Sequence, residues 1–288
     1  MTRVPPSVVR VAAEFGISPV TWTRPECGLS AAERHVVTFS NGMTAFVKGA
    51  TTDETAAWLR HEHAVLGRVA GRLGPEIIAW VDDPERPVLV TTDLSSAYWP
   101  AATGTTLWRD GDIESLLTDL ARLRQESVDE SLAPASWPAA HWADLIEGGI
   151  PVTLGLCSPD WLDRHAVELL RLDAAAQPQW TALVHGDVRS DNLCFLADGS
   201  IRLVDWSVAG RGHPLHDLLL VLPTLRLEGG PEPHTILQGP LELIVRFAGG
   251  TLSLAVGDRP MPDWLQDVLR RLAAIQLTWL GHLLGDPP

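Results

Sequence analysis

The sequence predicts an α+β fold in two parts: a strand-rich part over residues 1–94 and a mainly helical part over residues 95–288. About five short strand patterns precede residue 95, whereas strand patterns are scarce after it. A chain of 288 residues is also long enough to form one large domain or two lobes. This change in pattern places the domain boundary near residues 92–95.

The strand-rich part is expected to form an antiparallel sheet with one helix before it and one within it. Residues 5–15 match a short amphipathic helix that ends at Gly16. Strands are predicted over residues 20–24, 34–40, 43–49, 76–81 and 87–92. Asn41-Gly42 is a turn sequence typical of a hairpin, and it joins the second and third strands.

Lys48 is the only lysine in the sequence, and a carboxylate is predicted to lie beside it. Lys48 ends the third strand, and Glu62 falls on the apolar face of a helix predicted over residues 52–73. A buried carboxylate is costly unless it is paired. We therefore expect an ion pair between Lys48 and Glu62. The alternatives are a surface lysine at a strand end and a glutamate at the exposed edge of its helix.

A second hairpin is predicted at Asp198-Gly199, which lies between two apolar runs. With a two-residue turn, Ala197 faces Ser200, and Asn192 faces Asp205. Cross-strand Cα atoms lie roughly 4.5–5.5 Å apart. A neutral amide oxygen and a carboxylate at that separation can share one Mg²⁺, whose other ligands are phosphate and water. The alternative is a simple hydrogen bond at the end of the hairpin.

Three motifs around this hairpin occur in a characteristic order. They are His185-Gly186-Asp187-Val188-Arg189-Ser190-Asp191-Asn192, then Val204-Asp205-Trp206, then Gly212-His213-Pro214-Leu215-His216-Asp217-Leu218. Together they resemble the aminoglycoside phosphotransferase/choline kinase-like family, which has the two-lobed protein-kinase fold and phosphorylates small molecules. The resemblance covers most of residues 20–225 and is specific over residues 185–217. It implies a nucleotide-binding lobe over residues 1–94 and a catalytic, acceptor-binding lobe over residues 95–288.

The resemblance also implies roles for individual residues in the catalytic loop. Asp187 would orient the acceptor hydroxyl and take its proton. Asn192 and Asp205 would hold Mg²⁺. Arg189 either stabilises charge on the moving phosphoryl group or forms a salt bridge with Asp191. His185 would orient the loop, and Asp217 would brace it.

The donor nucleotide, ATP or GTP, would bind to the N-terminal lobe. Lys48, oriented by Glu62, would bind its α- and β-phosphates. The loop Gly28-Leu29-Ser30 would cover the phosphates, and the backbone at Thr92 and Leu94 would meet the base. The sequence contains neither GxGxxG nor GxxxxGK[ST], which argues against a P-loop enzyme.

Composition limits the classes of partner. A net charge of −14 opposes binding to nucleic acid and suits a cationic acceptor, although many proteins are simply acidic. Three scattered cysteines without a CxxC pattern favour a reducing compartment over a zinc site. The first 15 residues lack a signal-peptide pattern, and the most apolar run, residues 215–225, contains His216, Asp217 and Pro223. A cytoplasmic protein that binds no membrane is therefore expected.

The helical part is predicted to contain helices over residues 112–126, 142–147, 159–176, 214–224, 235–247 and 262–284, with loops at Gly229-Gly230-Pro231 and Gly249-Gly250. Trp137, Trp142 and Trp161 lie in this part, either in the core or in an acceptor pocket. Three functions remain open: modification of an aminoglycoside or other antibiotic, phosphorylation of a metabolite such as choline, a sugar or an amino-alcohol, and a nucleotide-binding pseudokinase.

Overall fold

A computed structural model describes residues 3–25, 28, 30–69, 71–101, 105–126, 128–258 and 260–288. Leu29 of the predicted phosphate loop lies outside these residues, as does Cys27. The chain forms two compact units. The N-terminal unit comprises Met1–Leu123, Asp129–Ala133 and His185–Gly210, and the C-terminal unit comprises Arg124–Val128, Pro134–Val184 and Arg211–Pro288. The predicted lobe boundary near residue 94 stays a prediction.

The N-terminal unit contains a five-stranded antiparallel sheet, which confirms the predicted architecture of this part. The strands run in the order β1-β2-β3-β5-β4. Their bounds are Pro19–Thr23 (β1), Glu33–Phe39 (β2), Thr44–Gly49 (β3), Ile77–Val81 (β4) and Val88–Thr92 (β5). The hairpin predicted at Asn41-Gly42 joins β2 to β3, but its loop has three residues, 40–42, because the Phe39 amide donates to the Met43 carbonyl at 2.9 Å. Gly42 is left-handed in this loop.

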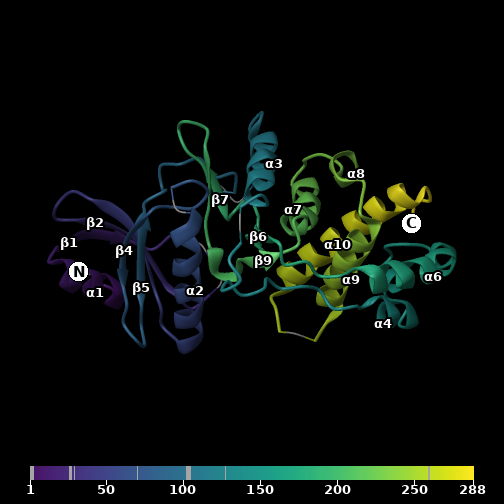
Figure 1. Ribbon diagram of the computed structural model, residues 1–288, viewed down its shortest axis with the longest axis horizontal. Coiled ribbons are helices and arrows are strands. Elements are labelled where there is room, and N and C mark those ends of the chain that lie inside the picture. Colours follow the sequence, from purple (N-terminus) through teal and green to yellow (C-terminus); the bar gives the residue numbers. More distant parts are fainter. Residues whose placement is uncertain are drawn as a thin grey trace. The chain divides into compact units, whose positions relative to one another are not determined.

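Two helices cover the two faces of this sheet. Helix α1 (Pro6–Phe15) places Val8 and Val11 in a core with strand residues such as Val37, Val47 and Val90. Helix α2 (Asp53–Val69) lies on the other side of the sheet (Figure 1). Because side chains alternate along β3, Val47 faces α1 and Lys48 faces α2. The sheet therefore delivers the lysine to the α2 side.

A short hairpin in the N-terminal unit lies within the motifs that were predicted to form the catalytic loop. Strand β7 (Leu193–Phe195) pairs with β8 (Ile201–Leu203), and the one-turn helix η1 (Trp206–Val208) follows. The hairpin was predicted correctly, but its register was wrong by one residue: Leu193 pairs with Leu203, so Asn192 lies opposite Val204 and not opposite Asp205.

The loop of the hairpin explains the error. Leu196 and Ser200 close a three-residue loop through a backbone hydrogen bond of 2.8 Å, and Gly199 is left-handed with φ of 81°. The Asp198 carboxylate accepts hydrogen bonds from both the amide and the hydroxyl of Ser200. Three-residue hairpin loops of this kind carry a glycine in the left-handed position, which adds one residue to the loop.

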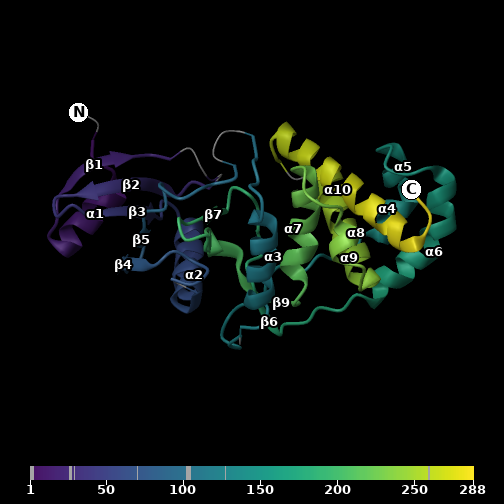
Figure 2. The ribbon, with the colours of Figure 1, turned by 90° about the horizontal axis from the view of Figure 1, so that it is seen from above.

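The C-terminal unit is mainly helical, as predicted. Its helices are α4 (Trp142–Glu147), α5 (Ile150–Thr153), α6 (Pro159–Ala175), α7 (His216–Leu227), α8 (Pro233–Ile236), α9 (Leu241–Val256) and α10 (Asp263–Leu284). Helices α9 and α10 pack side by side in both ribbon views (Figures 1 and 2). Strands β6 (Ala182–Val184) and β9 (Gly210–Gly212) form a two-stranded sheet, and α3 (Asp112–Leu123) belongs to the N-terminal unit.

Two predictions for this unit were wrong. The helix expected over residues 235–247 is divided into α8 and α9, because Gly239-Pro240 separates them. The loop expected at Gly249-Gly250 lies instead inside α9. Glycine is needed at both positions because neighbouring side chains leave no room for a Cβ atom. A Cβ atom at Gly249 would lie 2.8 Å from Nε1 of Trp142, and one at Gly250 would lie 2.8 Å from Cβ of Pro138.

The tryptophans of this unit are largely part of its core. Trp142 and Trp161 are fully buried, and their indole nitrogens donate to the carbonyl oxygens of Val245 and Asp286. Packing therefore accounts for these two side chains. Within the described part of the chain, no helix is both long and apolar enough to cross a membrane.

Candidate active site

Lys48 lies between two carboxylates. Its ammonium nitrogen is 2.6 Å from Oε2 of Glu62 on α2 and 3.0 Å from Oδ1 of Asp205, which follows β8. The ion pair expected between Lys48 and Glu62 is therefore present, and both side chains are buried, with 11% and 6% of their surface exposed. Three distant stretches of the sequence meet at this one nitrogen.

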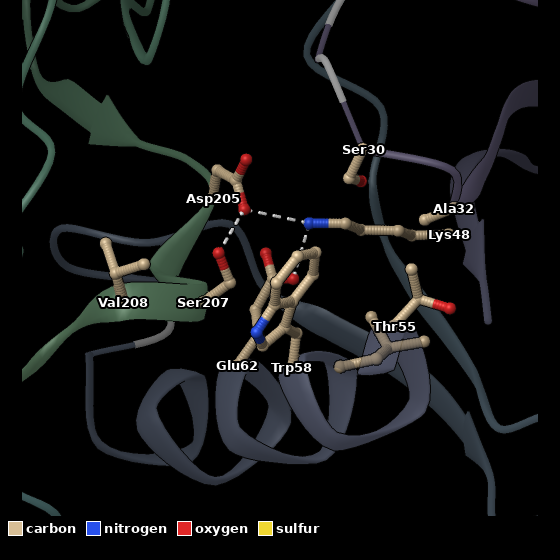
Figure 3. A pocket seen from close by; sticks show the side chains of 10 residues that line it. Ser30, Ala32, Lys48, Thr55, Trp58, Glu62, Asp205, Ser207 and Val208 are labelled. Atoms are coloured by element: carbon tan, nitrogen blue, oxygen red, sulfur yellow. Dashed lines mark hydrogen bonds and ion pairs between the residues drawn. The ribbon is translucent and has the colours of Figure 1, made fainter. Parts of the chain in front are cut away.

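These three residues line a pocket of about 110 Å³ in the N-terminal unit (Figure 3). The other lining residues are Ser30, Ala32, Thr55, Trp58, Leu59, Ser207 and Val208. Figure 3 shows the Lys48 amine pointing at Asp205, with Ser30 on the opposite wall from Glu62. The volume is below the ~300–1,000 Å³ of pockets that enclose a whole small-molecule ligand. It suits a charged group at the end of a larger ligand.

Pairing between Lys48 and the two carboxylates determines the protonation states of the groups at this pocket. Burial lowers the pKa of Lys48, but the charges of Glu62 and Asp205 outweigh it and hold that pKa above its ordinary value. Burial raises the pKa of Asp205, but Lys48 and the Ser207 hydroxyl outweigh it and hold that pKa below its ordinary value. Lys48 is therefore a cation and Asp205 an anion at neutral pH.

Asp205 is held in an unusual backbone conformation. With φ of 63° and ψ of 62°, it is the only non-glycine residue with positive φ in the part of the chain that the structure describes. Its Oδ1 accepts from the Ser207 hydroxyl at 2.9 Å as well as from Lys48. A strained residue of this kind persists only when its surroundings fix it, and such residues cluster at functional sites.

Asp187 and Asn192 form a second group in the same unit. The Asn192 amide nitrogen donates to Oδ2 of Asp187 at 2.9 Å and to the Asp187 carbonyl oxygen at 3.0 Å. The fully buried His185 ring bridges the loop: Nε2 bonds to the Val204 carbonyl at 3.0 Å, and Nδ1 accepts from the Asp187 amide at 3.2 Å. Since the carbonyl can only accept, the proton lies on Nε2. This geometry suits an orienting group.

The environment of Asp187 differs from that of Asp205. Burial raises the pKa of Asp187, and the charges of Asp191 and Asp205 add to this effect, while Arg189 opposes it. The net effect is a pKa above the ordinary value. Two carboxyl groups whose surroundings move their pKa values in opposite directions are suited to different roles, one as a proton acceptor and one as a permanent anion.

Arg189 contacts both neighbouring aspartates. Its guanidinium forms two hydrogen bonds with Asp191, at 3.0 and 3.1 Å, and lies 3.6 Å from Oδ1 of Asp187. The salt bridge with Asp191 is therefore present. The guanidinium also lies near Asp187, so the two interpretations of Arg189 do not exclude each other.

The oxygen donors of Asn192 and Asp205 fit a hard cation such as Mg²⁺. Because the Asn192 nitrogen already bonds to Asp187, its amide oxygen points elsewhere. Lys48 and Ser207 both bind Oδ1 of Asp205, and Figure 3 shows the second oxygen pointing away from Lys48. The described residues contain no cluster of three His, Cys, Asp or Glu side chains that could hold a metal. Phosphate or water would complete the coordination, as Mg²⁺ commonly requires.

The remaining predicted residues have distinct positions. Ser30 lines the pocket, whereas Thr92 and Leu94 do not. Thr92 ends β5, and its amide donates to the Glu76 carbonyl at 3.0 Å. The Leu94 carbonyl accepts from Ala97 and from the Trp99 indole, each at 3.0 Å. Asp217 is buried on α7 of the C-terminal unit.

Two residues of the pocket region were missed. Ser207 holds Asp205, and Arg34 on β2 contacts the loop that carries Ser30. Arg34 lies opposite Lys48 because the hairpin loop contains three residues, 40–42. A two-residue turn at Asn41-Gly42 would instead place His35 opposite Lys48. The contact of Ser207 depends on the left-handed turn at Asp205, which no local pattern indicates.

A family model described as "Phosphotransferase enzyme family" matches residues 21–246 of this chain. None of the curated proteins is similar enough in sequence to count as a match. The matched range includes Lys48, Glu62, Asp187, Asn192 and Asp205.

Solved structures of similar fold cover nearly the whole chain. A macrolide 2′-phosphotransferase type I has a TM-score of 0.54 at 19% identity, over 99% of this chain and 95% of that one. A thermostable mutant of aminoglycoside phosphotransferase APH(4)-Ia, in complex with AMP-PNP and hygromycin B, has a TM-score of 0.58 at 16% identity, over 93% and 98%. A provisionally assigned fructosamine-3-kinase from Haemophilus somnus has a TM-score of 0.50 at 12% identity, over 92% and 96%. These similarities confirm the predicted kinase-like fold.

Proposed function

The chain belongs to the phosphotransferase enzyme family, and on that premise we propose that it transfers the γ-phosphoryl group of a nucleoside triphosphate to a hydroxyl of a small molecule. The observation that carries this proposal is the Lys48 ammonium, held at 2.6 Å from Glu62 and 3.0 Å from Asp205 in a pocket. A permanently charged cation beside a carboxylate that can hold metal is the arrangement that phosphoryl transfer requires.

Lys48 would bind the α- and β-phosphates of the donor. Glu62 holds the lysine side chain extended toward Asp205, so little rearrangement is needed when phosphate oxygens approach. Ser30 would contact the phosphates from the opposite wall of the pocket. The base would lie against the backbone near Thr92 and Leu94, which follows from the family resemblance alone.

Asp187 would orient the acceptor hydroxyl and accept its proton. Asn192 fixes one carboxylate oxygen of Asp187 at 2.9 Å, which leaves Oδ1 for the acceptor. The raised pKa brings this carboxyl closer to neutral pH than an ordinary aspartate, which favours proton transfer while the group remains ionised. Arg189, 3.6 Å from Asp187, would stabilise negative charge on the transferred group.

Asn192 and Asp205 would hold Mg²⁺ through the two oxygens that the protein leaves available. Bound there, the ion would neutralise charge on the donor phosphates. Asp205 is suited to this role because its lowered pKa keeps it anionic. Lys48 shares Asp205 with the metal site and so links the two.

An antibiotic of aminoglycoside type is the favoured acceptor, which would make the protein a resistance enzyme of the cytoplasm. Two structures of similar fold are an aminoglycoside phosphotransferase and a macrolide phosphotransferase, and the net charge of −14 suits a cationic acceptor. A metabolic acceptor is the second candidate, because a fold of TM-score 0.50 belongs to the provisionally assigned fructosamine-3-kinase.

Phosphate transfer from labelled ATP and GTP to a panel of acceptors would test this proposal. The panel should contain aminoglycosides, macrolides, choline, amino sugars and fructosamines, with Asp187→Asn as the control for chemistry. Transfer to an antibiotic supports the first candidate, and transfer only to a metabolite supports the second. Tight nucleotide binding that Asp187→Asn leaves unchanged, with no transfer to any acceptor, would favour a pseudokinase.

A further inference from the structure

Arg34 is a second buried cation beside the Lys48 pocket. It lies on β2 directly opposite Lys48 on β3, so the two side chains share one face of the sheet. Only 6% of Arg34 is exposed. A buried guanidinium is always charged and has five donors in a rigid, planar arrangement. The acceptors of its hydrogen bonds indicate what the Arg34 side chain does.

Among the described residues, the hydrogen bonds of Arg34 go to the segment before β2. Nη1 donates to the carbonyl oxygens of Ser30 and Ala32 at 3.2 and 3.1 Å, and Nη2 donates to the Ser30 hydroxyl at 2.6 Å. The loop has a second anchor, because the Thr51 hydroxyl donates to the Ala31 carbonyl at 2.8 Å. Arg34 thus fixes both the backbone and the side chain of Ser30.

Gly28 lies closely against the Arg34 guanidinium. Its φ is +74°, and a Cβ atom there would lie 2.7 Å from Cζ of Arg34 and 2.8 Å from both Nε and Nη2. A side chain at position 28 would therefore displace the guanidinium as well as strain the backbone. Glycine at position 28 makes room for the Arg34 side chain, and this close contact explains why a glycine suits that position.

The bond from Arg34 sets the direction of the Ser30 hydroxyl proton. A hydroxyl that accepts a hydrogen bond from a cation still has its own proton to donate. Ser30 lines the pocket with Lys48, and within the described residues its hydroxyl takes part only in the bond that it accepts from Arg34. A phosphate oxygen in the pocket would be such an acceptor, and charge-assisted bonds of this kind are strong.

Arg34 also acts on the two carboxylates through its charge. Burial raises the pKa of Glu62, and Arg34 together with Lys48 opposes that rise; at Asp205, Arg34 adds to the larger effect of Lys48 in lowering the pKa. Lys48 is thus the cation that lines the pocket, and Arg34 adds a second positive charge behind the lining residue Ser30. Both charges would attract a polyphosphate.

We propose that Arg34 is a positioning residue for the donor phosphates: it fixes Ser30 and Ala32 ahead of β2 and turns the Ser30 hydroxyl toward a phosphate oxygen. This role depends on the proposed function, because it presupposes that the donor phosphates occupy the Lys48 pocket. Arg34 would thereby strengthen binding of the nucleoside triphosphate without strengthening binding of the corresponding nucleoside.

The test compares dissociation constants for a nucleoside triphosphate with Mg²⁺ and for the corresponding nucleoside, measured by calorimetry or competition. Arg34→Gln and Ser30→Ala should each weaken triphosphate binding by roughly tenfold to a hundredfold and leave nucleoside binding unchanged. The double variant should lose little more triphosphate affinity than either single variant, because both substitutions remove the same contact, that of the oriented Ser30 hydroxyl. Arg34→Lys should resemble Arg34→Gln, because lysine lacks the planar arrangement of donors.

Arg60→Gln is the matched control. Arg60 lies in the same unit and also donates to loop carbonyls, those of Asp83 and Pro84, but neither of these acceptors lines the pocket, whereas Ser30 does. It should leave both dissociation constants unchanged. Gly28→Ala should weaken triphosphate binding as Arg34→Gln does, because it displaces the same guanidinium.

Three results would overturn the role of Arg34: triphosphate binding unchanged in Arg34→Gln, equal losses for triphosphate and nucleoside, or full additivity with Ser30→Ala. Equal losses would mean that Arg34 only stabilises the fold. Failure of the wild type itself to bind any nucleoside triphosphate would instead overturn the proposed function. The two failures are therefore distinguished by the wild-type measurement.

Discussion

The amide nitrogen of Asn192 donates to Oδ2 of Asp187 at 2.9 Å and to the Asp187 carbonyl at 3.0 Å. One side chain thereby fixes both the backbone and the carboxylate of the proposed proton acceptor. Because its nitrogen is used in this way, the Asn192 oxygen is directed elsewhere. The same residue can therefore orient Asp187 and offer an oxygen to a metal.

Asp187→Asn should lower kcat by about 10²- to 10⁴-fold while leaving nucleotide binding intact. The amide cannot accept the acceptor's proton, and general-base catalysis contributes about 10²- to 10⁴-fold. Steady-state kinetics should show this loss in kcat, with the dissociation constant for the triphosphate within about twofold of the wild type. Asp191→Asn is the control, since Asp191 is a more exposed carboxylate of the same loop and should keep most of the activity. Equal losses in both variants would contradict the assignment of Asp187.

The pH profile should reveal the raised pKa of Asp187. Protonation removes the base, so kcat/KM should fall as the pH drops through that pKa, which lies above the ordinary value of about 3.9. Asp191→Asn should move this acid limb to lower pH, because the Asp191 charge helps to raise the pKa. Arg189→Gln should move it to higher pH, because Arg189 opposes the rise. Profiles of kcat/KM from pH 4 to 8 measure both shifts, and shifts in the same direction would contradict this account.

Lys48→Met should destabilise the protein more at high pH than at low pH. The substitution leaves the buried Glu62 without its partner, and removing one member of a buried pair costs about 3–5 kcal/mol. Burial raises the pKa of Glu62, and Lys48 opposes this effect. In Lys48→Met the folded state therefore binds a proton more tightly than the unfolded state, and its stability falls as the pH rises.

Urea unfolding at pH 5 and pH 8 measures this difference. The double variant Lys48→Met with Glu62→Gln is the control, because it removes the carboxyl that titrates and should show a smaller pH dependence. A Lys48→Met protein whose loss of stability is the same at both pH values would show that Glu62 does not depend on Lys48.

The sequence was sufficient to predict contacts that depend on regular geometry. Strand alternation and helix periodicity placed Lys48 and Glu62 on facing surfaces, and the ion pair follows from the cost of an unpaired buried charge. The hairpin register was one residue out, because Asp198-Gly199 is compatible with both a two-residue and a three-residue loop. The Asp198 side chain and the left-handed Gly199 select the longer loop.

Other features depend on tertiary contacts that no local pattern encodes. Gly249-Gly250 has the composition of a loop, yet both residues lie inside α9, because Trp142 and Pro138 approach too closely for a side chain. The left-handed conformation of Asp205 and its bond to Ser207 likewise depend on the surrounding structure. Propensity is overridden by packing at such positions.

Gly249→Ala should therefore destabilise the protein by about 1–3 kcal/mol, because the new methyl group overlaps the Trp142 indole, which donates to Val245. The matched control is Gly67→Ala in α2, where a Cβ atom meets nothing within 4 Å. That change should stabilise the helix by about 0.5–1 kcal/mol. Thermal or urea unfolding measures both, and a Gly249→Ala protein as stable as the wild type would contradict the close packing.

The most direct test of the proposed function uses the fact that Lys48 is the only lysine in the chain. An acyl phosphate derivative of ATP or GTP transfers its acyl group to an amine that lies beside the bound phosphates, and mass spectrometry identifies the modified residue. We expect acylation of Lys48, with protection by excess unmodified nucleotide and Mg²⁺ and no such labelling in Lys48→Met. Labelling confined to the N-terminal amine, or labelling of Lys48 that excess nucleotide does not reduce, would show that the donor phosphates do not bind in this pocket.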